Sequence, residues 1–452
     1  MNFRTSKRAR VRALTAITGV AAAVIAMVTA PPTGAAPPTE PVACPKVYPV
    51  TQLTKDQPVN GFTVSTGNEP EEFTGTVLGV LDDGIAPGID MIIVRLSSAV
   101  IDNAGIWGGM SGSPVYADDG RLIGAVSYGL TWEASPVGGL TPAGKMKALL
   151  GGGGSSATAK ALATTQHVAL PQRIQQRLVS DGLATQTEAQ AGMTRLPLPL
   201  GVSGSVSVAR LKKAESRLSG ASLLDRPDVL VYKSGAAPTA AAGSDEISAG
   251  SNLAATISYG DFTAGGIGTT TMVCNDTQVV GFGHPFDWTG DSTLTMNGAD
   301  VITVLKDNIG GSYKLANITG PVGGITGDHL TGISGPVGED GIPATALIRS
   351  NVTLVSTGKS RTGTTYTSVP NYLPEVALFA EESNQDVIFD RVGAGSSLVR
   401  FLVTGTADGQ EFTLMRTNRF ANSYDISFES IFEVVRRCVR SRYPSRQWPS
   451  RL

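Results

Sequence analysis

The sequence is poor in charge, in aromatic side chains, in histidine and in cysteine. Charged residues make up 16% and aromatic residues 6% of the 452 positions, whereas about 25% charged residues is usual. So little charge is a poor fit to coiled coils and long exposed helices. The chain instead holds 54 glycines among many valines, threonines and serines. This mixture predicts short strands joined by tight turns, and therefore a mainly β fold.

Long apolar runs are missing from the sequence, except for one near its start. A basic stretch that ends at Arg12 is followed by the apolar run 13–30 and by small residues at 33–36. This order is typical of a secretory signal peptide, here residues 1–36 with cleavage near Ala35 or Ala36. A membrane anchor is the alternative, because the run is close to the minimum length of a span. We expect a secreted or cell-surface protein with no membrane span after cleavage.

Positive charge is concentrated at the two ends of the chain. The net charge is −2, but the first twelve residues and the arginine-rich tail 436–452 carry basic groups without a compensating acid. The body between them is therefore acidic, which argues against nucleic acid as the main partner. The tail is either a solvated, frayed end or a means of association with the cell envelope.

Three cysteines are too few for a disulfide scaffold but sufficient for one bridge. Outside the cytoplasm we expect Cys44 to pair with Cys274, because Cys438 lies in the basic tail. No Cys or His pair has the spacing of a metal site. We expect no metal and no cofactor.

Changes in composition divide the chain into segments. Short apolar runs broken by glycine turns recur on both sides of a polar, alanine-rich stretch with a glycine-rich start. Helices are predicted near 171–179, 208–218 and 428–437, and a hairpin over 399–417. The predicted segments are a signal peptide at 1–36, a β-rich half at 37–150, a flexible and helical linker at 151–220, a second β-rich half at 221–435 and the basic tail at 436–452.

One stretch has the pattern of a nucleophilic turn. Residues 108–116 read Gly-Gly-Met-Ser-Gly-Ser-Pro-Val-Tyr. A serine that transfers acyl groups needs a sharp turn, with its own N–H and a second N–H directed at one point, and such donors contribute about 3–4 kcal/mol each. Gly109 and Ser111 have the spacing for these two donors. A strand then returns the chain, and Ser127, Tyr128 and Gly129 would offer a main-chain edge that binds an extended peptide.

These motifs resemble those of a known family. Gly-Met-Ser-Gly-Ser-Pro at 109–114 and Gly-Arg-Leu-Ile-Gly-Ala-Val-Ser-Tyr-Gly at 120–129 are similar to the nucleophile segment of chymotrypsin-like serine peptidases. They are more similar still to that of the SpoIVB peptidase family, whose members carry their base in a Gly-His segment. The Gly-His pair here is Gly283-His284. The resemblance implies a mainly β fold of two chymotrypsin-like barrel halves joined by a partly helical linker, with Ser111 as nucleophile and His284 as base.

The sequence departs from the family pattern in two ways. The SpoIVB family comprises the secreted signalling peptidases of sporulation and their relatives. In the sporulation enzyme the histidine segment precedes the serine segment, and a PDZ domain lies upstream. Here Ser111 comes before His284, and there is no room for a PDZ domain before the β-rich half. Triads are recognised by their geometry and occur in several chain orders.

The remaining catalytic candidates are less specific. His167 lies in the polar linker and is expected at the surface, while His329 is the reserve base. Asp102 is the first choice for an acid that orients the imidazole, and a Ser–His dyad is the alternative. Four other carboxylates are candidates for that role: Asp90, Asp287, Asp291 and Asp300. A carboxylate at such a position is usually a turn cap or a solvated charge.

We expect an exported serine endopeptidase that acts through an acyl-enzyme on a peptide or protein substrate. In the chymotrypsin-like layout that the resemblance implies, the residue six before the serine lies at the base of the specificity pocket. Here it is Gly105, which carries no charge and favours a small or apolar substrate side chain, and Trp107 would either line that pocket or pack in the core. Self-cleavage in the 151–165 linker is a further hypothesis. The alternatives are a non-catalytic peptide-binding protein on the same fold and a cell-envelope scaffold that uses the basic tail.

Overall fold

The computed structural model describes residues 43–130, 134–151, 167–204, 207–218, 223–224, 226, 228–307, 311–407 and 409–432. The predicted signal peptide, most of the glycine-rich start of the linker, Cys438 and the basic tail lie outside the described residues. The described residues belong to one compact unit. Within the described ranges, no helix combines the length and the apolar character that a membrane crossing requires.

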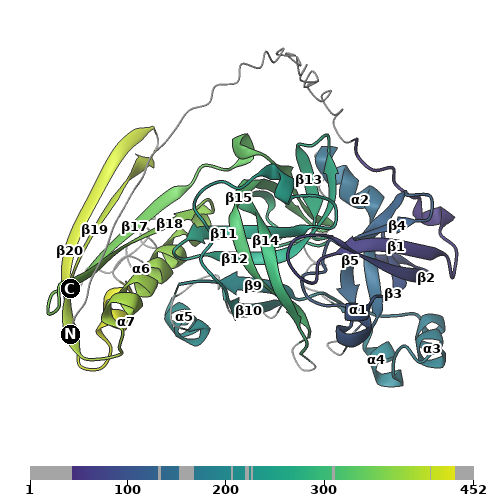
Figure 1. The fold of residues 1–452 in the computed structure, drawn as a ribbon, viewed down its shortest axis with the longest axis horizontal. Coiled ribbons are helices and arrows are strands. Elements are labelled where there is room, and N and C mark those ends of the chain that lie inside the picture. Colours follow the sequence, from purple (N-terminus) through teal and green to yellow (C-terminus); the bar gives the residue numbers. More distant parts are fainter. Residues whose placement is uncertain are drawn as a thin grey trace, which may run out of the picture. The chain divides into compact units, whose positions relative to one another are not determined.

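Six strands of the first half close into a barrel (Figure 1). They pair in the order β1-β2-β3-β6-β5-β4, and β4 completes the ring by pairing with both β1 and β5. Their bounds are β1 Pro58–Thr63, β2 Glu71–Ala86, β3 Ile89–Ser97, β4 Pro114–Ala117, β5 Leu122–Gly129 and β6 Val137–Pro142. Two helices belong to this half, α1 Ala99–Ala104 and α2 Ala143–Lys147.

The second half contains a ring with the same strand order. Its pairing runs β11-β12-β13-β16-β15-β14 and returns from β14 to β11. The bounds are β11 Asn252–Gly260, β12 Ala264–Cys274, β13 Gln278–Gly281, β14 Gly290–Leu305, β15 Tyr313–His329 and β16 Gly332–Pro336. In both rings the first three strands form a meander. The third strand then pairs with the sixth, the sixth with the fifth and the fifth with the fourth, and the fourth closes the ring on the first.

The segment between the barrels attaches to both of them. It consists of β7 His167–Val168, α3 Gln172–Ser180, α4 Gln186–Ala191, β8 Met193–Arg195, β9 Leu198–Val202, α5 Val208–Glu215 and β10 Val229–Lys233. A capping box between Thr185 and Glu188 starts α4, because each side chain binds a backbone N–H that the first helical turn leaves free. β8 extends the first barrel's sheet beside β5, and β9 pairs with β12 of the second.

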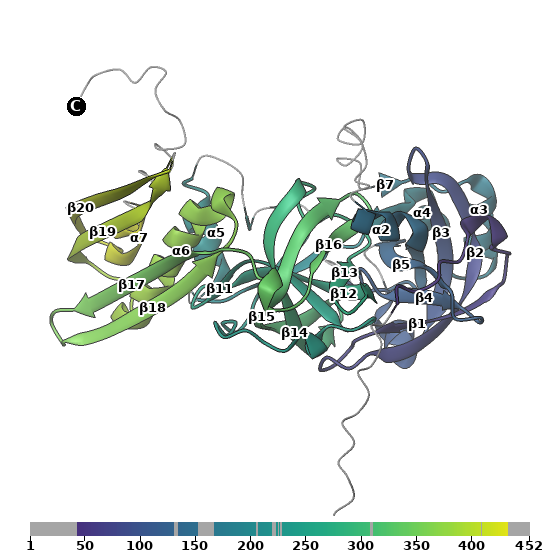
Figure 2. The ribbon, with the colours of Figure 1, turned by 90° about the horizontal axis from the view of Figure 1, so that it is seen from above.

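The C-terminal elements lie beyond the second barrel (Figure 2). They are β17 Ala346–Leu354, β18 Lys359–Thr367, α6 Leu373–Phe389, β19 Gly395–Ala407, β20 Gln410–Asn422 and α7 Ile426–Ser430. β17 and β18 extend the ten-stranded sheet through β11, and α6 packs against both of them. β19 and β20 form a separate two-stranded hairpin.

The prediction of a mainly β fold is confirmed, with 48% strand, 20% helix and a closed six-stranded barrel beside another sheet. Helices appear where 171–179 and 208–218 predict them, as α3 and α5. The seventeen-residue α6 was not expected. Its buried face includes Asn384 and Gln385 as well as leucine and phenylalanine, so it lacks the apolar stripe by which amphipathic helices are recognised.

The two barrels pack against each other and share a disulfide. One apolar cluster joins Leu122 and Met146 of the first half to Met272 and Val280 of the second. Cys44, which precedes the first barrel, is bonded to Cys274 at the end of β12. A cut in the linker would therefore leave two fragments that separate only after reduction.

Candidate active site

Ser111 and His284 lie in equivalent loops of the two barrels. Ser111 is in the turn between α1 and β4, and His284 is in the turn between β13 and β14. Each turn therefore connects the third to the fourth strand of its ring. When the barrels pack, the two turns meet.

The serine and the histidine form a hydrogen-bonded pair. The distance between Ser111 Oγ and His284 Nε2 is 2.8 Å. His284 Nδ1 lies 2.9 Å from the carbonyl oxygen of Pro285. A carbonyl only accepts, so Nδ1 carries the proton and the neutral imidazole accepts the serine O–H at Nε2. This is the tautomer that a general base for Ser111 requires.

Burial keeps the imidazole neutral. Loss of hydration, aided by the positive charge of Arg195, lowers the pKa of His284 from 6.5 to about 3. The Pro285 carbonyl and the carboxylate of Asp228 act in the opposite direction. A base in these surroundings is free of its proton at neutral pH, and an imidazolium formed there would be poorly stabilised.

No carboxylate orients the imidazole, so the expectation for Asp102 needs correction. Asp102 is exposed on α1 and accepts from the Ser97 hydroxyl at 3.0 Å. The group that accepts the hydrogen bond from His284 Nδ1 is the carbonyl of Pro285. The other acidic candidates also lie elsewhere: Asp90 accepts from the N–H of Asp83, Asp287 pairs with Arg226, and Asp291 and Asp300 are exposed on β14. The described residues thus form a Ser–His dyad.

The turn around Ser111 is held by the second barrel through its carbonyls. Gly108 O accepts from Lys314 N at 3.0 Å, and Ser111 O accepts from Thr269 N at 2.8 Å. The Thr269 hydroxyl donates to Gly109 O at 2.8 Å, and the Thr271 hydroxyl donates to Gly112 O at 2.7 Å. The second barrel thereby fixes the direction of several peptide groups in this turn.

The two predicted oxyanion donors are unoccupied. Within the described part of the chain, the N–H groups of Gly109 and Ser111 have no hydrogen-bond partner. In a planar trans peptide the N–H points away from the C=O. Because Gly108 O and Met110 O are bonded to Lys314 and Ser113, the N–H groups of the same peptides point away from these contacts. They are available to a substrate oxygen.

Two glycines allow the halves to approach at the site. Gly112 has φ +100°, and a Cβ there would lie 1.9 Å from Thr269 O of the second barrel. Gly283 has φ +69°, and a Cβ there would lie 2.0 Å from Ser127 Oγ of the first barrel. A side chain at either position would push the barrels apart. Phe282 beside Gly283 has φ +68°, a strained conformation that places His284 at the contact.

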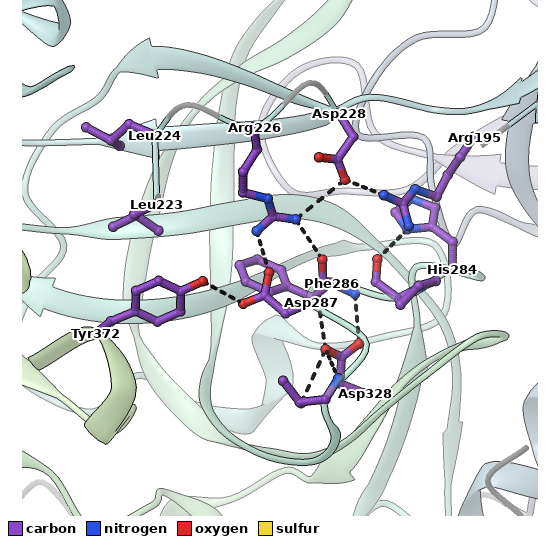
Figure 3. A network of polar contacts seen from close by, with 12 residues as sticks. Arg195, Leu223, Leu224, Arg226, Asp228, His284, Phe286, Asp287, Asp328 and Tyr372 are labelled. Carbon is purple, nitrogen blue, oxygen red and sulfur yellow. Dashed lines mark hydrogen bonds and ion pairs between the residues drawn. The ribbon is translucent and has the colours of Figure 1, made fainter. Parts of the chain in front are cut away.

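A buried carboxylate holds the histidine turn. Asp328 at the end of β15 accepts the backbone N–H of Phe286 at 2.8 Å, of Asp287 at 2.7 Å and of Thr289 at 3.3 Å (Figure 3). Burial raises the pKa of this carboxyl, and the three N–H donors act against that rise. Asp328 therefore positions the main chain after His284 rather than the imidazole itself.

Ion pairs continue this network to the linker. Arg226 donates to the Phe286 carbonyl at 2.9 Å and pairs with Asp287 and Asp228. Asp228 also pairs with Arg195 of β8 (Figure 3). The Tyr372 hydroxyl donates to Asp287 at 3.0 Å. The turn that carries His284 is thus connected through charged side chains to the segment between the barrels.

A buried lysine lies behind the Ser111 turn. The aliphatic chain of Lys314 packs against Gly109, where a Cβ would lie 2.9 Å from its Cδ. Its Nζ donates to Asn252 Oδ1 at 2.9 Å and to Thr269 Oγ1 at 3.1 Å. Burial lowers the pKa of Lys314 to about 7, against the attraction of Glu71. The amine thus supports the threonine whose hydroxyl holds Gly109.

The predicted peptide-binding edge is occupied by the protein itself. Tyr128 and Gly129 pair antiparallel with Arg195 and Thr194 of β8, and Leu196 N donates to Ser127 O at 3.0 Å. Ser111 and His284 are each only 1% exposed. A surface hollow of about 600 Å³ lies instead over β1, β2 and β4, and neither residue lines it.

The remaining predicted residues lie outside the pair. His167 is exposed and contacts the carbonyl of Ala191, and His329 is half-buried at the end of β15. The Cys44–Cys274 bond is present. Among the residues described, no three His, Cys, Asp or Glu side chains gather as a metal site would need.

No family model, curated protein or solved structure matches this chain. Its function must therefore be argued from the chemistry of the site.

Sequence reasoning missed four residues that build the site: Arg195, Thr269, Lys314 and Asp328. Their contacts depend on how the barrels dock, and no local pattern marks them. A weak signal was present for Asp328, because an acidic residue in a glycine-rich strand that is buried needs a specific set of donors.

The Asp328→Ala substitution should loosen the histidine turn. It leaves the N–H of buried Phe286, and those of half-buried Asp287 and exposed Thr289, without this acceptor, and an unsatisfied buried group costs about 1–3 kcal/mol. We expect a loss of about 1–3 kcal/mol in the free energy of unfolding, measured by urea denaturation. Asp328→Asn retains one oxygen and should lose less. Equal stability of wild type and Asp328→Ala would contradict this role.

Lys314 should make stability depend on pH in the alkaline range. Its pKa is about 7 in the folded protein and ordinarily 10.5, so between these values the unfolded chain binds the extra proton. Unfolding free energy therefore rises with pH in this window, by up to about 1.4 kcal/mol per pH unit. Lys314→Met should remove this slope in denaturation curves recorded from pH 7 to 10. Parallel profiles for the two proteins would count against a depressed pKa.

Proposed function

We propose that this chain is an exported serine peptidase of the SpoIVB type that acts through a Ser–His dyad. The observation that carries the proposal is the 2.8 Å contact between Ser111 Oγ and His284 Nε2, in the tautomer that the Pro285 carbonyl requires. A glycine-rich turn with two unpaired N–H groups lies at the same place. Together these are the nucleophile, base and oxyanion donors of acyl transfer.

The reaction follows from these positions. Ser111 Oγ attacks the carbonyl carbon of a peptide while His284 Nε2 takes the serine proton. The N–H groups of Gly109 and Ser111 bind the oxygen as it becomes negative. His284 then gives the proton to the leaving amine, and the acyl group stays on Ser111 until water releases it. The dyad needs no cofactor.

A carbonyl in place of a carboxylate has a kinetic consequence. The Pro285 oxygen holds the imidazole in one tautomer, as an acid would, but it carries no full negative charge. Burial and Arg195 both oppose the imidazolium. We therefore expect slow acylation, as suits a regulatory peptidase with few substrates better than a digestive one.

Export is part of the proposal. The basic and apolar stretch at the start has the order of a signal peptide. The disulfide between Cys44 and Cys274 is stable in oxidising compartments and uncommon in the cytoplasm. A secreted or cell-surface location is consistent with both.

The second candidate is a non-catalytic peptide-binding or scaffold protein on the same fold. The near-complete burial of Ser111 and His284 favours it, because a closed site binds no substrate in the state described. Envelope association through residues 436–452 would belong to this reading, and that tail lies outside the described residues.

A fluorophosphonate probe separates the two candidates. An activated serine bonds to the probe through its Oγ, and loss of its general base typically lowers the rate by about 10²–10⁴-fold. We expect labelling of the mature wild type that disappears in Ser111→Ala and in His284→Ala. Labelling should be measured over hours by intact mass, because the site is buried.

The control is Asp102→Asn, a change on the exposed face of α1. Surface substitutions usually alter free energies by less than about 0.5 kcal/mol, so its labelling rate should stay within about twofold of the wild type. A folded wild-type protein that remains unlabelled would favour the scaffold. Loss of labelling in Asp102→Asn would restore a role for that acid.

A further inference from the structure

The segment from Thr194 to Pro197 lies along the 127–129 edge and reaches the turn that carries Ser111 at Gly108. Val126 N donates to Ser113 O at 3.0 Å and Gly112 N donates to Val126 O at 2.8 Å, so the Ser111 turn lies beside the start of the edge 127–129. The edge residue nearest to Ser111 is therefore Ser127, and its carbonyl accepts the N–H of Leu196. A Cβ on Gly108 would lie 2.8 Å from Pro197 O. The Leu196–Pro197 bond thus lies between Ser127 of the edge and Gly108 at the start of the Ser111 turn.

The pairing register is that of a bound peptide. Leu196 binds Ser127, Arg195 lies opposite Tyr128, and Thr194 lies opposite Gly129. An extended ligand that adds a strand to a sheet edge gains affinity from such main-chain bonds, and its alternate side chains enter pockets. The order along the edge places Leu196 next to the attacking serine and Arg195 next to His284.

The side chains of the segment are held as a ligand's would be. Leu196 is 5% exposed and belongs to the apolar cluster that includes Trp107 and Met110. Arg195 lies close enough to His284 for its charge to act on the imidazole, and its guanidinium pairs with Asp228 (Figure 3). An apolar anchor beside the serine and an ion pair beside the histidine keep the segment in place.

The segment is not aligned for cleavage. The carbonyl of Leu196 makes no hydrogen bond with Gly109 N or Ser111 N among the described residues. The next residue is Pro197, whose ring restricts the backbone at the bond that would break. The segment therefore occupies the site without presenting its carbonyl to the oxyanion donors.

We propose that Thr194–Pro197 is an internal pseudosubstrate that closes the Ser111–His284 site. It also shows the preferred ligand: a peptide in extended conformation with leucine or a similar apolar residue before the attacked bond. The preference for a leucine-containing substrate rests on the proposed peptidase function. The occupancy of the site by Thr194–Pro197 rests on the strand pairing alone. Access for a substrate requires that β8 leave the 127–129 edge.

Occupancy is tested without catalysis by the accessibility of position 111. In full-length mature protein carrying Ser111→Cys and Cys438→Ser, the rate of alkylation by iodoacetamide reports how often the site opens. We expect alkylation at least about 100-fold slower than in urea-unfolded protein, as for other groups protected by local opening. Alkylation at the unfolded rate in the native protein would overturn the proposal.

Two variants should open the site in this background. Arg195→Ala removes the ion pair while Asp228 keeps Arg226, and Arg195→Ala with Leu196→Ala also removes the apolar anchor. We expect alkylation to accelerate by about tenfold or more in the double variant, because loss of a buried leucine shifts a local equilibrium by more than one decade. The single variant should fall between the double variant and the parent.

The matched control is Leu178→Ala on α3. Leu178 is at least as buried as Leu196 and lies in the same segment between the barrels, but in another apolar cluster. If this variant accelerates alkylation as much as the double variant, the effect is general loosening and the pseudosubstrate is excluded.

Substrate class is tested with Ser111 intact in the Arg195→Ala, Leu196→Ala protein. A peptidyl phosphonate with a leucine side chain should label it at least about tenfold faster than its lysine counterpart, since one charged group in an apolar pocket is strongly disfavoured. Equal rates would overturn the proposed preference. If the variants open the site but no phosphonate labels it, the peptidase proposal is refuted and the occupancy of the site by the segment stands. If the fluorophosphonate labels the protein but alkylation is neither slow nor dependent on the segment, the occupancy is refuted and the peptidase proposal stands.

Discussion

The site depends on the docking of the Ser111 turn against β12 and β15 of the second barrel. Thr269, Thr271 and Lys314 bind carbonyls of this turn. The Lys314 contact with Gly108 O directs the Gly109 N–H, and the Ser113 contact with Met110 O directs the Ser111 N–H. The same contact brings His284 to the serine. Neither barrel alone contains a nucleophile with a base, so the stability of their interface is also the stability of the site. The Cys44–Cys274 disulfide and the mixed apolar cluster around it maintain that interface.

Chain order has little influence on this arrangement. Both barrels follow the strand order 1-2-3-6-5-4, and each contributes the loop between its third and fourth strands. Since the loops are equivalent, either barrel can come first in the chain and still supply its half of the pair. The reversed order of serine and histidine is therefore compatible with the geometry, and the link between the barrels becomes the variable part. In this protein that link runs through the place a substrate would take.

The sequence predicted the mainly β fold and drew attention to Ser111 and His284, because these features are local. Glycine-rich turns and short apolar runs indicate strands, and Gly-Met-Ser-Gly-Ser-Pro indicates a sharp turn whatever lies around it. The Pro285 carbonyl, Asp328 and Lys314 could not be found in this way, since their roles arise from contacts between segments far apart in the chain. Asp102 lies near Ser111 in the sequence, and this nearness says nothing about the partner of His284. The helix α6 was not predicted because polar side chains such as Asn384 are buried on it, so the sequence shows no helical period of apolar residues.

The central claim is that His284 is a neutral base that accepts the Ser111 proton at Nε2. Nitrogen-15 NMR of the histidine side chains, recorded from pH 8 to 4 on wild type and on Ser111→Ala, tests it most directly. The account predicts a proton on Nδ1, an unprotonated Nε2 whose chemical shift changes on loss of the serine hydroxyl, and no protonation of this ring near the ordinary pKa of 6.5. A proton on Nε2, or titration near 6.5 with no response to Ser111→Ala, would contradict it.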